Sequence, residues 1–274
     1  ARQRRERPPC VASFCHCHFS LAFKLGSSPD VEGLQGRATG GAQQPPMARM
    51  TPHLMLVACA SLARGFLRQQ VRRPAPIAAS LCDDAAALAE AGAVFPATTH
   101  DGLAVATFAG GCFWGLQLAF DREPGVVDSV VGYTHGHAER PTYADVCDET
   151  TGHTEAVLVK YSPEIVSFAR LAAVLFDVVG DPTTLNRVGR DRGTNYRTGM
   201  YCHSDAQLRD AEEALAVEDR CWQSSGRPVV TEVKRAAVFW PAEAVHQRYL
   251  ENGGRFGRPQ SAAKGCADEI RCYG

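Results

Sequence analysis

A single cysteine, Cys112, stands in the stretch GGCFWG at the junction between a predicted strand and a predicted helix. A thiol in the first turn of a helix faces the partial positive charge of the helix N-terminus, which lowers its pKa and favours a nucleophile at neutral pH. The preceding glycines let backbone amides approach a ligand, and Phe113 and Trp114 offer an apolar wall. Free cysteines are also among the most buried residue types, so this stretch alone fits a packed core equally well.

The elements that position this cysteine begin near residue 102, where strand and helix patterns start to interleave. Predicted strands cover 104–110, 126–136, 154–162, 196–202 and 228–240, and predicted helices start near residue 112 and cover 165–179, 204–220 and 241–251. This order indicates one α+β domain of about 170 residues, built as a two-layer α/β sandwich.

Several separated motifs accompany GCFWG in a fixed order. They are GYTHG, PTYADVC, TTGHTEAVLVKY, DPTTLNRVGRDRGTNYRTGMY and the C-terminal RFGRPQSAAKGCADEIRCYG. Together they resemble the A-type peptide methionine sulfoxide reductases over nearly the whole predicted domain, and the tail is most similar to that of plant and algal members. The expected fold is then a sandwich with a ferredoxin-like core and long coil segments.

The resemblance implies a reaction at sulfur. In that family the cysteine matching Cys112 attacks the sulfur of a methionine S-sulfoxide, methionine leaves, and the cysteine becomes a sulfenic acid. The departing oxygen needs a proton, and Glu155 matches the family's acid. Strand alternation places Glu155 on one face with Val157 and Val159, which predicts an inward, buried carboxyl that stays protonated. An exposed glutamate at a strand start is the alternative.

The same resemblance implies the rest of the site. Tyr143 and Tyr196 match phenols that hold the sulfoxide oxygen by hydrogen bonds. Phe113 and Trp114 match the substrate-binding pair that packs against the methyl group. Asp191 matches a position that organises the loop of the site.

The sulfenic acid must then be reduced, and two tail cysteines are suited to this step. A second thiol condenses with it to a disulfide, which an external dithiol reduces by exchange. We expect Cys266 to resolve first and Cys272 to relay the disulfide to thioredoxin, on a flexible tail; the reverse order, or one cysteine acting alone, stays open. Thioredoxin is the expected reductant, with no resident cofactor and no metal.

Bulk composition narrows the class of protein. The 274 residues have a formal net charge of −1 and 45% hydrophobic content, which gives no basic field for nucleic acid and enough apolar surface for a core. No window approaches the roughly 18 apolar residues of a membrane-spanning helix. Eleven cysteines cannot all pair within one chain. We expect a monomer, with Cys147, Cys202 and Cys221 as buried structural thiols.

The first hundred residues differ in character. Residues 1–46 have the composition of a disordered or non-mature extension, and 47–82 are rich in arginine and free of acidic residues, as in an organelle transit peptide. A surface amphipathic helix is the alternative for the second stretch. Residues 83–101 read as a partly helical linker, and 102–274 as the catalytic domain with its redox-active tail. The leader favours the chloroplast, with the mitochondrion or the cytoplasm as alternatives.

Two other functions would also use an activated cysteine. One is a thiol peroxidase or disulfide oxidoreductase, which needs a resolving thiol but has no use for an aromatic pocket for a methyl group. The other is a non-catalytic module that binds a metal or senses redox state through its cysteines. The substrates expected from the resemblance are oxidised proteins or free methionine sulfoxide.

Overall fold

The computed structural model describes residues 80–272. The expected extension, 1–46, and all but the end of the expected transit peptide, 47–82, lie outside the described residues. The helices are α1 (Leu81–Glu90), α2 (Phe113–Arg122), α3 (Tyr143–Cys147), α4 (Phe168–Val179) and α5 (Asp205–Trp222). The strands are β1 (Ala104–Gly110), β2 (Val126–Thr134), β3 (Thr154–Tyr161), β4 (Arg187–Val188), β5 (Asp191–Arg192), β6 (Thr198–Cys202), β7 (Glu232–Arg235) and β8 (Phe239–Pro241).

Six strands form one sheet in the order β7-β6-β1-β3-β2-β8, and β4 pairs with β5 in a separate hairpin. The central four strands, β6-β1-β3-β2, are antiparallel throughout and follow the β1-α2-β2-β3-α4-β6 chain order of a ferredoxin-like core. The predicted fold class is therefore confirmed. β7 adds to one edge in parallel with β6, and β8 adds to the other edge beside β2.

The sheet is curled, as the short connection between its two edge strands requires. Only residues 236–238 separate β7 from β8. Such a connection reaches about 14 Å, whereas the outer strands of a flat six-stranded sheet lie about 24 Å apart. The edges therefore bend toward one another.

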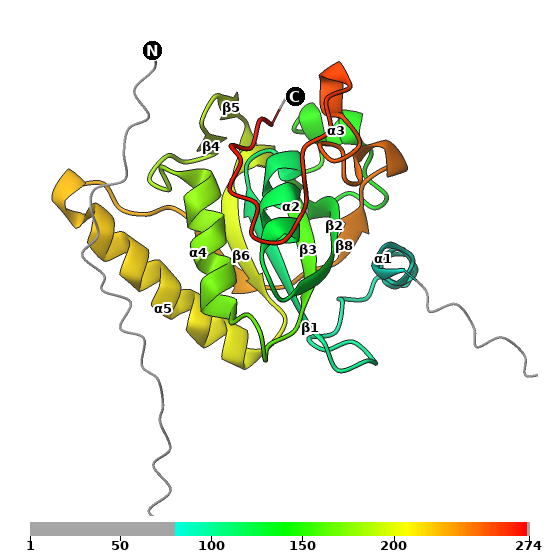
Figure 1. Cartoon of the computed structure of the whole chain (residues 1–274), viewed down its shortest axis with the longest axis horizontal. Helices are drawn as coiled ribbons and strands as arrows, with labels where there is room; N and C mark the ends of the chain where they lie inside the picture. Colours follow the sequence, from blue (N-terminus) through cyan, green and yellow to red (C-terminus); the bar gives the residue numbers. More distant parts are fainter. Residues whose placement is uncertain (1–79, 273–274) are drawn as a thin grey trace, which may run out of the picture. The chain divides into compact units, whose positions relative to one another are not determined.

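Both faces of the sheet are covered, which explains why β3 is buried along almost its whole length. On one face, Val157 and Val159 belong to a core that includes Leu116 of α2 and Leu175 of α4. Figure 1 shows α2 and α4 in front of the sheet, with α5 beside α4. This large core fixes α2, and with it the position of Cys112.

The opposite face is covered by α1 and the segment after it. Leu81, Ala85 and Phe95 pack there with Ala156 and Leu158 of β3. Ser80 begins the helix with a reciprocal capping box to Asp83. Residues 83–101, expected to form a linker, thus contribute a helix to the packing.

Two sequence expectations about the C-terminal part are wrong. The predicted strand 228–240 is two short strands on opposite edges of the sheet. The predicted helix 241–251 is a single 3-10 turn, Ala244–His246, followed by hydrogen-bonded turns. Its side chains make long-range bonds instead: Glu243 accepts from the backbone N–H of Tyr143, and Gln247 bonds the backbone of Val131. Arg248 then has a left-handed φ of 52°, which an α-helix does not allow.

Among residues 80–272, no helix is both long enough and apolar enough to cross a membrane.

Candidate active site

Cys112 is the N-cap residue of α2, and one residue separates it from the end of β1, so it lies at a strand-to-helix junction as the sequence predicts. It is buried, with 8% of its surface exposed. Gly111 before it has a left-handed φ of 75°, and a side chain there would lie 2.6 Å from Val188 of β4. Glycine therefore permits both the sharp turn into the helix and the close approach of the β4–β5 hairpin. The hairpin therefore packs against the turn that precedes Cys112.

Glu155 lies beside the start of the same helix. Only 1% of it is exposed, as strand alternation predicts, and its Oε2 accepts a hydrogen bond from the backbone N–H of Phe113 at 2.9 Å. Burial raises the pKa of Glu155 to about 8, the Phe113 hydrogen bond opposes this, and nearby Asp191 adds to it. At neutral pH the carboxyl is therefore mostly protonated and able to donate.

The expected lowering of the Cys112 pKa is wrong for this state of the protein. Burial raises it well above that of a free thiol, and the negative charges of Glu155 and Cys272 act in the same direction. A backbone hydrogen bond from Trp114 opposes the shift. Loss of water outweighs the half-charge of the helix N-terminus, so the resting residue is a thiol.

Both predicted phenols lie around Glu155. Tyr143 begins α3, and Tyr196 ends the 3-10 turn Thr194–Tyr196. Burial raises the pKa of each phenol, and in both cases the charge of Glu155 raises it further. Both hydroxyls therefore keep their protons and can act as hydrogen-bond donors.

Carboxylates hold the two phenol-bearing segments in place. Glu243 accepts from the backbone N–H of Tyr143 at 2.8 Å. Glu149 accepts from both the backbone N–H and the hydroxyl of Thr194, each at 2.8 Å. The loop after α3 is in this way tied to the turn that contains Tyr196.

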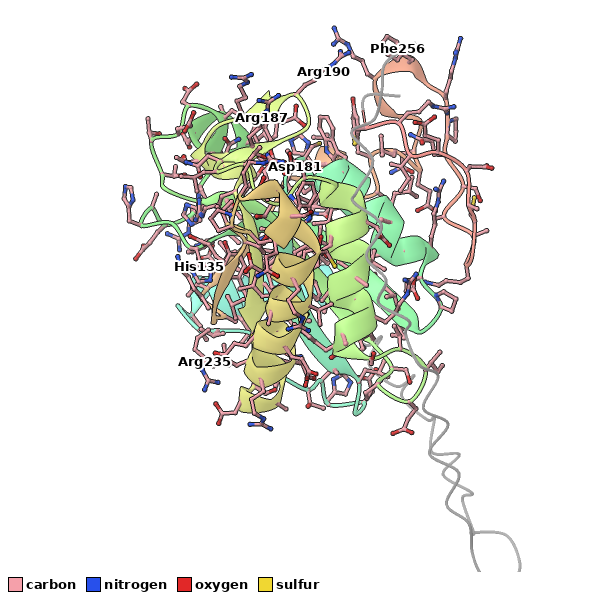
Figure 2. The ribbon with its side chains drawn as sticks, turned by 90° about the vertical axis from the view of Figure 1, so that its left-hand side faces the viewer. His135, Asp181, Arg187, Arg190, Arg235 and Phe256 are labelled. Carbon is pink, nitrogen blue, oxygen red and sulfur yellow. The ribbon has the colours of Figure 1, made fainter. Side chains whose placement is uncertain are left out.

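Asp191 lies opposite Val188 in the β4–β5 hairpin, and cross-strand partners share a face. Because Val188 packs on Gly111, this face is directed at the cysteine. The charge of Asp191 accordingly raises the pKa of Cys112, Glu155 and Tyr196. Figure 2 shows Arg187 and Arg190 of the hairpin at the same end of the molecule as Phe256.

The two aromatic residues after the cysteine have different exposure. Phe113 is fully buried, whereas Trp114 is partly exposed. Trp114 stacks on Tyr249 with ring centroids 4.0 Å apart, and His246 stacks on Trp114 at 5.7 Å and lies against Tyr143 at 4.3 Å. These rings form an aromatic wall that extends from Trp114 to the Tyr143 phenol.

Sequence reasoning missed His246, Tyr249 and Cys147 as members of this site. The first two lie in the segment expected to be a helix, where the only signal was two ring-bearing residues three positions apart. Cys147, expected to be buried, is exposed, and its thiol shares a hydrogen bond with the Tyr143 hydroxyl. Cys202 is buried as expected. Cys221, also expected to be a buried thiol, is partly exposed and is disulfide-bonded.

The tail places one of its two cysteines next to the site. Cys272 Sγ lies against Gly115, one helical turn after Cys112, and the charge of Cys272 contributes to the raised pKa of Cys112. Cys266 is partly exposed. The tail is also packed rather than free: Arg122 and Lys264 join it to α2 by hydrogen bonds.

Within the described part of the chain, no group of three or more His, Cys, Asp or Glu side chains could hold a metal ion. The fold defines a ferredoxin-like α/β protein. Its site contains a buried cysteine at a helix N-terminus and a protonated carboxyl beside it, and the thiol of Cys272 packs against the same helix.

Comparisons with known proteins identify the family. The family model described as peptide methionine sulfoxide reductase matches residues 104–269. The peptide methionine sulfoxide reductase of Brassica napus is 52% identical over 169 residues, and peptide methionine sulfoxide reductase A4, chloroplastic, of Arabidopsis thaliana is 50% identical over 169 residues. Each alignment spans 62% of this chain and 64% of the relative.

A third relative is covered almost completely. Peptide methionine sulfoxide reductase A3 of Arabidopsis thaliana is 45% identical over 213 residues, which are 78% of this chain and 97% of the relative. The chain belongs to the peptide methionine sulfoxide reductase family, which confirms the resemblance noted in the sequence.

Two solved structures are similar in fold. Reduced Mxr1 of Saccharomyces cerevisiae shares 31% identity with a TM-score of 0.51, over 57% of this chain and 88% of that chain. Methionine sulfoxide reductase A of Corynebacterium diphtheriae shares 30% identity with a TM-score of 0.52, over 57% of this chain and 80% of that chain.

Proposed function

We propose that the protein reduces the S epimer of methionine sulfoxide, free or in oxidised proteins, to methionine. It would thus be an oxidoreductase of protein repair, a peptide-methionine (S)-S-oxide reductase. Family membership supports this activity. The observation on which the proposal chiefly rests is the pairing of Cys112 with Glu155, whose buried carboxyl has a pKa of about 8 and lies at the start of the helix that Cys112 caps.

Substrate binding would use the aromatic wall and the phenols. The methyl group packs against Phe113 and Trp114, since transfer of a methyl group from water to an apolar surface is favourable. The sulfoxide oxygen, which has a partial negative charge, accepts hydrogen bonds from the hydroxyls of Tyr143 and Tyr196. Tyr143 would exchange its hydrogen bond with Cys147 for one with the substrate.

The first chemical step transfers one oxygen and two electrons. The sulfur of Cys112 attacks the sulfoxide sulfur, Glu155 protonates the sulfoxide oxygen, and the thiol proton of Cys112 replaces the one that Glu155 gave up. The hydroxyl then passes from the substrate sulfur to the sulfur of Cys112, as the substrate S–O bond and the transient S–S bond break. Methionine leaves and Cys112 becomes a sulfenic acid, so the substrate sulfur is reduced by two electrons and the cysteine sulfur is oxidised by two. Asp191 assists by raising the pKa of Glu155.

The second step forms a disulfide. The position of Cys272 beside Gly115 supports Cys272, rather than Cys266, as the first resolving thiol. Its sulfur attacks the sulfenic sulfur of Cys112, the S–O bond breaks, and water leaves. Cys266 then attacks Cys272, which frees Cys112 and leaves a Cys266–Cys272 disulfide in the tail.

Thioredoxin would supply the two electrons that reduce this tail disulfide, by dithiol exchange. No resident cofactor enters either step, because every electron passes between sulfur atoms. Cys266 is suited to meet a protein reductant because it is partly exposed.

We also propose that the protein works in the chloroplast. The acid-free composition of residues 47–82 and the chloroplastic relative support this compartment over the mitochondrion and the cytoplasm. The full chain joined to a fluorescent protein should enter chloroplasts in plant or algal cells. Fluorescence confined to mitochondria or cytosol would overturn the assignment.

An assay against competing substrates tests the activity. The purified protein, with a dithiol, should convert the S epimer of a peptide methionine sulfoxide to methionine and leave the R epimer unchanged. Reduction of hydrogen peroxide without reduction of sulfoxide would favour a thiol peroxidase. Bound metal with no turnover would favour a metal-binding module.

A further inference from the structure

One face of α2 joins the nucleophile to the tail. Cys112, Gly115 and Arg122 follow one another at intervals of three and seven residues, which places them along the same side of the helix. Gly115 and Arg122 line a cavity of about 590 Å³, together with Cys266 and Cys272 of the tail. In Figure 1 the tail, coloured red, forms a loop that crosses in front of α2, and its last limb rises on the side of α2 that faces α4.

Gly115 brings the second thiol close to this face. A side chain at residue 115 would lie 2.5 Å from Cys272 Sγ, so the sulfur occupies the space that any other residue would fill. The sulfur of Cys272 therefore lies against α2, one helical turn after Cys112. Small departures of the tail from α2 would separate the two thiols.

Arg122, at the end of α2, holds the tail against the helix at three points. Its Nε donates to the carbonyl of Ser261 at 2.8 Å, and its Nη1 donates to the carbonyl of Asp268 at 2.6 Å. Its own carbonyl accepts from the backbone N–H of Gly265 at 2.7 Å. Only 5% of Arg122 is exposed, so these bonds form largely away from water and fix both limbs and the turn of the loop 261–268.

Lys264 reinforces the same attachment. Its Nζ donates to the carbonyls of Asp121 and Val126, at 2.6 and 2.7 Å. Only three residues separate Cys272 from Asp268, so a loop fixed at residue 268 leaves the thiol little freedom to move away from Gly115.

We propose that Arg122 is a positioning residue for the resolving step. It holds the loop 261–268 on α2 so that Cys272 meets the sulfenic acid of Cys112, forms the S–S bond and releases the oxygen as water. This inference rests on the proposed function. The planar guanidinium is required because it donates in two directions at once, which a lysine ammonium or a neutral amide does less well.

The test separates the first chemical step from the resolving step. In Arg122→Gln, the single-turnover yield and rate of methionine formation should equal those of the wild type. So should steady turnover with dithiothreitol, which reduces the sulfenic acid without the tail. Turnover with thioredoxin should fall about tenfold or more, because the two thiols are no longer pre-aligned. Dimedone should trap the sulfenic acid of Cys112 for longer.

Arg170→Gln is the matched control, since Arg170 lines the same cavity but pairs with Glu123 rather than with the tail. It should behave as the wild type in every assay. If Arg122→Gln does not fold, Lys264→Gln tests the same loop and should show the same selective loss.

Unchanged thioredoxin-supported turnover in a folded variant would overturn the inference. A parallel loss in the dithiothreitol and single-turnover assays would also overturn it, because that pattern indicates a merely structural role. A wild type that reduces no sulfoxide with dithiothreitol would instead contradict the proposed function.

Discussion

The carboxyl of Glu155 accepts a hydrogen bond from the backbone N–H of Phe113 at 2.9 Å, so an acid from β3 completes the first turn of the helix that Cys112 begins. This bond fixes the distance between the proposed nucleophile and the proposed proton donor. Both groups are buried and both are neutral at rest, because burial raises the pKa of each. A neutral pair of this kind can exchange protons with a substrate without leaving an uncompensated charge in the core.

Replacement of Glu155 by Gln should slow the first step. The amide oxygen can still accept from Phe113, so the helix start is preserved, but the amide cannot protonate the sulfoxide oxygen. We expect sulfenic acid formation to slow by about a hundredfold or more. Rapid-quench measurement of methionine in a single turnover checks this, and a rate equal to that of the wild type would contradict the role of Glu155 as acid.

The wild type and Glu155→Gln also test the raised pKa of Glu155, because that pKa makes the free energy of unfolding depend on pH. The folded pKa of Glu155, about 8, lies above the ordinary value of 4.5. The folded state therefore keeps a proton that the unfolded state has released, and the stability due to Glu155 is complete below the ordinary value and is lost as the pH rises through the folded one.

Urea unfolding at about pH 5 and about pH 9 measures this loss. The free energy of unfolding of Glu155→Gln minus that of the wild type should increase from about pH 5 to about pH 9, by an amount on the order of a few kcal/mol. Other titrating groups cancel in the difference between the two proteins. A difference that does not change with pH would show that Glu155 titrates normally.

Loss of one phenol should weaken the hold on the sulfoxide oxygen. Tyr143→Phe and Tyr196→Phe each keep the ring and remove one hydrogen-bond donor, so each should lower the rate of the first step, by up to about a hundredfold. Tyr201→Phe is a suitable control, because Tyr201 packs on the opposite face of the sheet and its hydroxyl donates to Glu232. Equal rates in all three variants and the wild type would remove the phenols from the mechanism.

Gly111→Ala should damage both fold and activity. A methyl group there meets Val188 at 2.6 Å on a backbone with φ of 75°, whereas Gly92, with φ of 65°, has nothing within 4 Å. Gly92→Ala should lose about 1 kcal/mol of stability, which is the cost of placing a residue with a side chain in the left-handed conformation. Gly111→Ala should lose more stability than this, because its methyl group also meets Val188, and it should displace Cys112. Thermal unfolding and single-turnover rates, measured side by side, decide whether the hairpin contact matters.

The central fold could be predicted from sequence because its pattern is local. Alternation in β3 places Glu155 on the face that contains Val157, and burial follows from that alternation. The capping Ser167 and the apolar run of α4 likewise define a helix without reference to the rest of the chain. The order of these elements indicates a two-layer α/β sandwich, and the ferredoxin-like core was expected from the family resemblance.

The C-terminal part depends on distant contacts that no local pattern contains. Helical spacing in 241–251 is overridden by Glu243 and Gln247, which bond to residues a hundred or more positions away. The tail sequence suggests flexibility, yet Arg122 holds it on α2. The same limit applies to Cys112, whose helix position predicts a lowered pKa, while the burial that raises it is visible only in three dimensions.

The most direct test of the account is a single turnover of the variant in which Cys266 and Cys272 are both replaced by Ser. Without resolving thiols, the reduced protein should release one methionine for each chain, and dimedone should label Cys112 with the same stoichiometry. Cys112→Ser in the same background should release none. Methionine formed without a sulfenic acid on Cys112, or label on another cysteine in its place, would contradict attack by Cys112 on the sulfoxide.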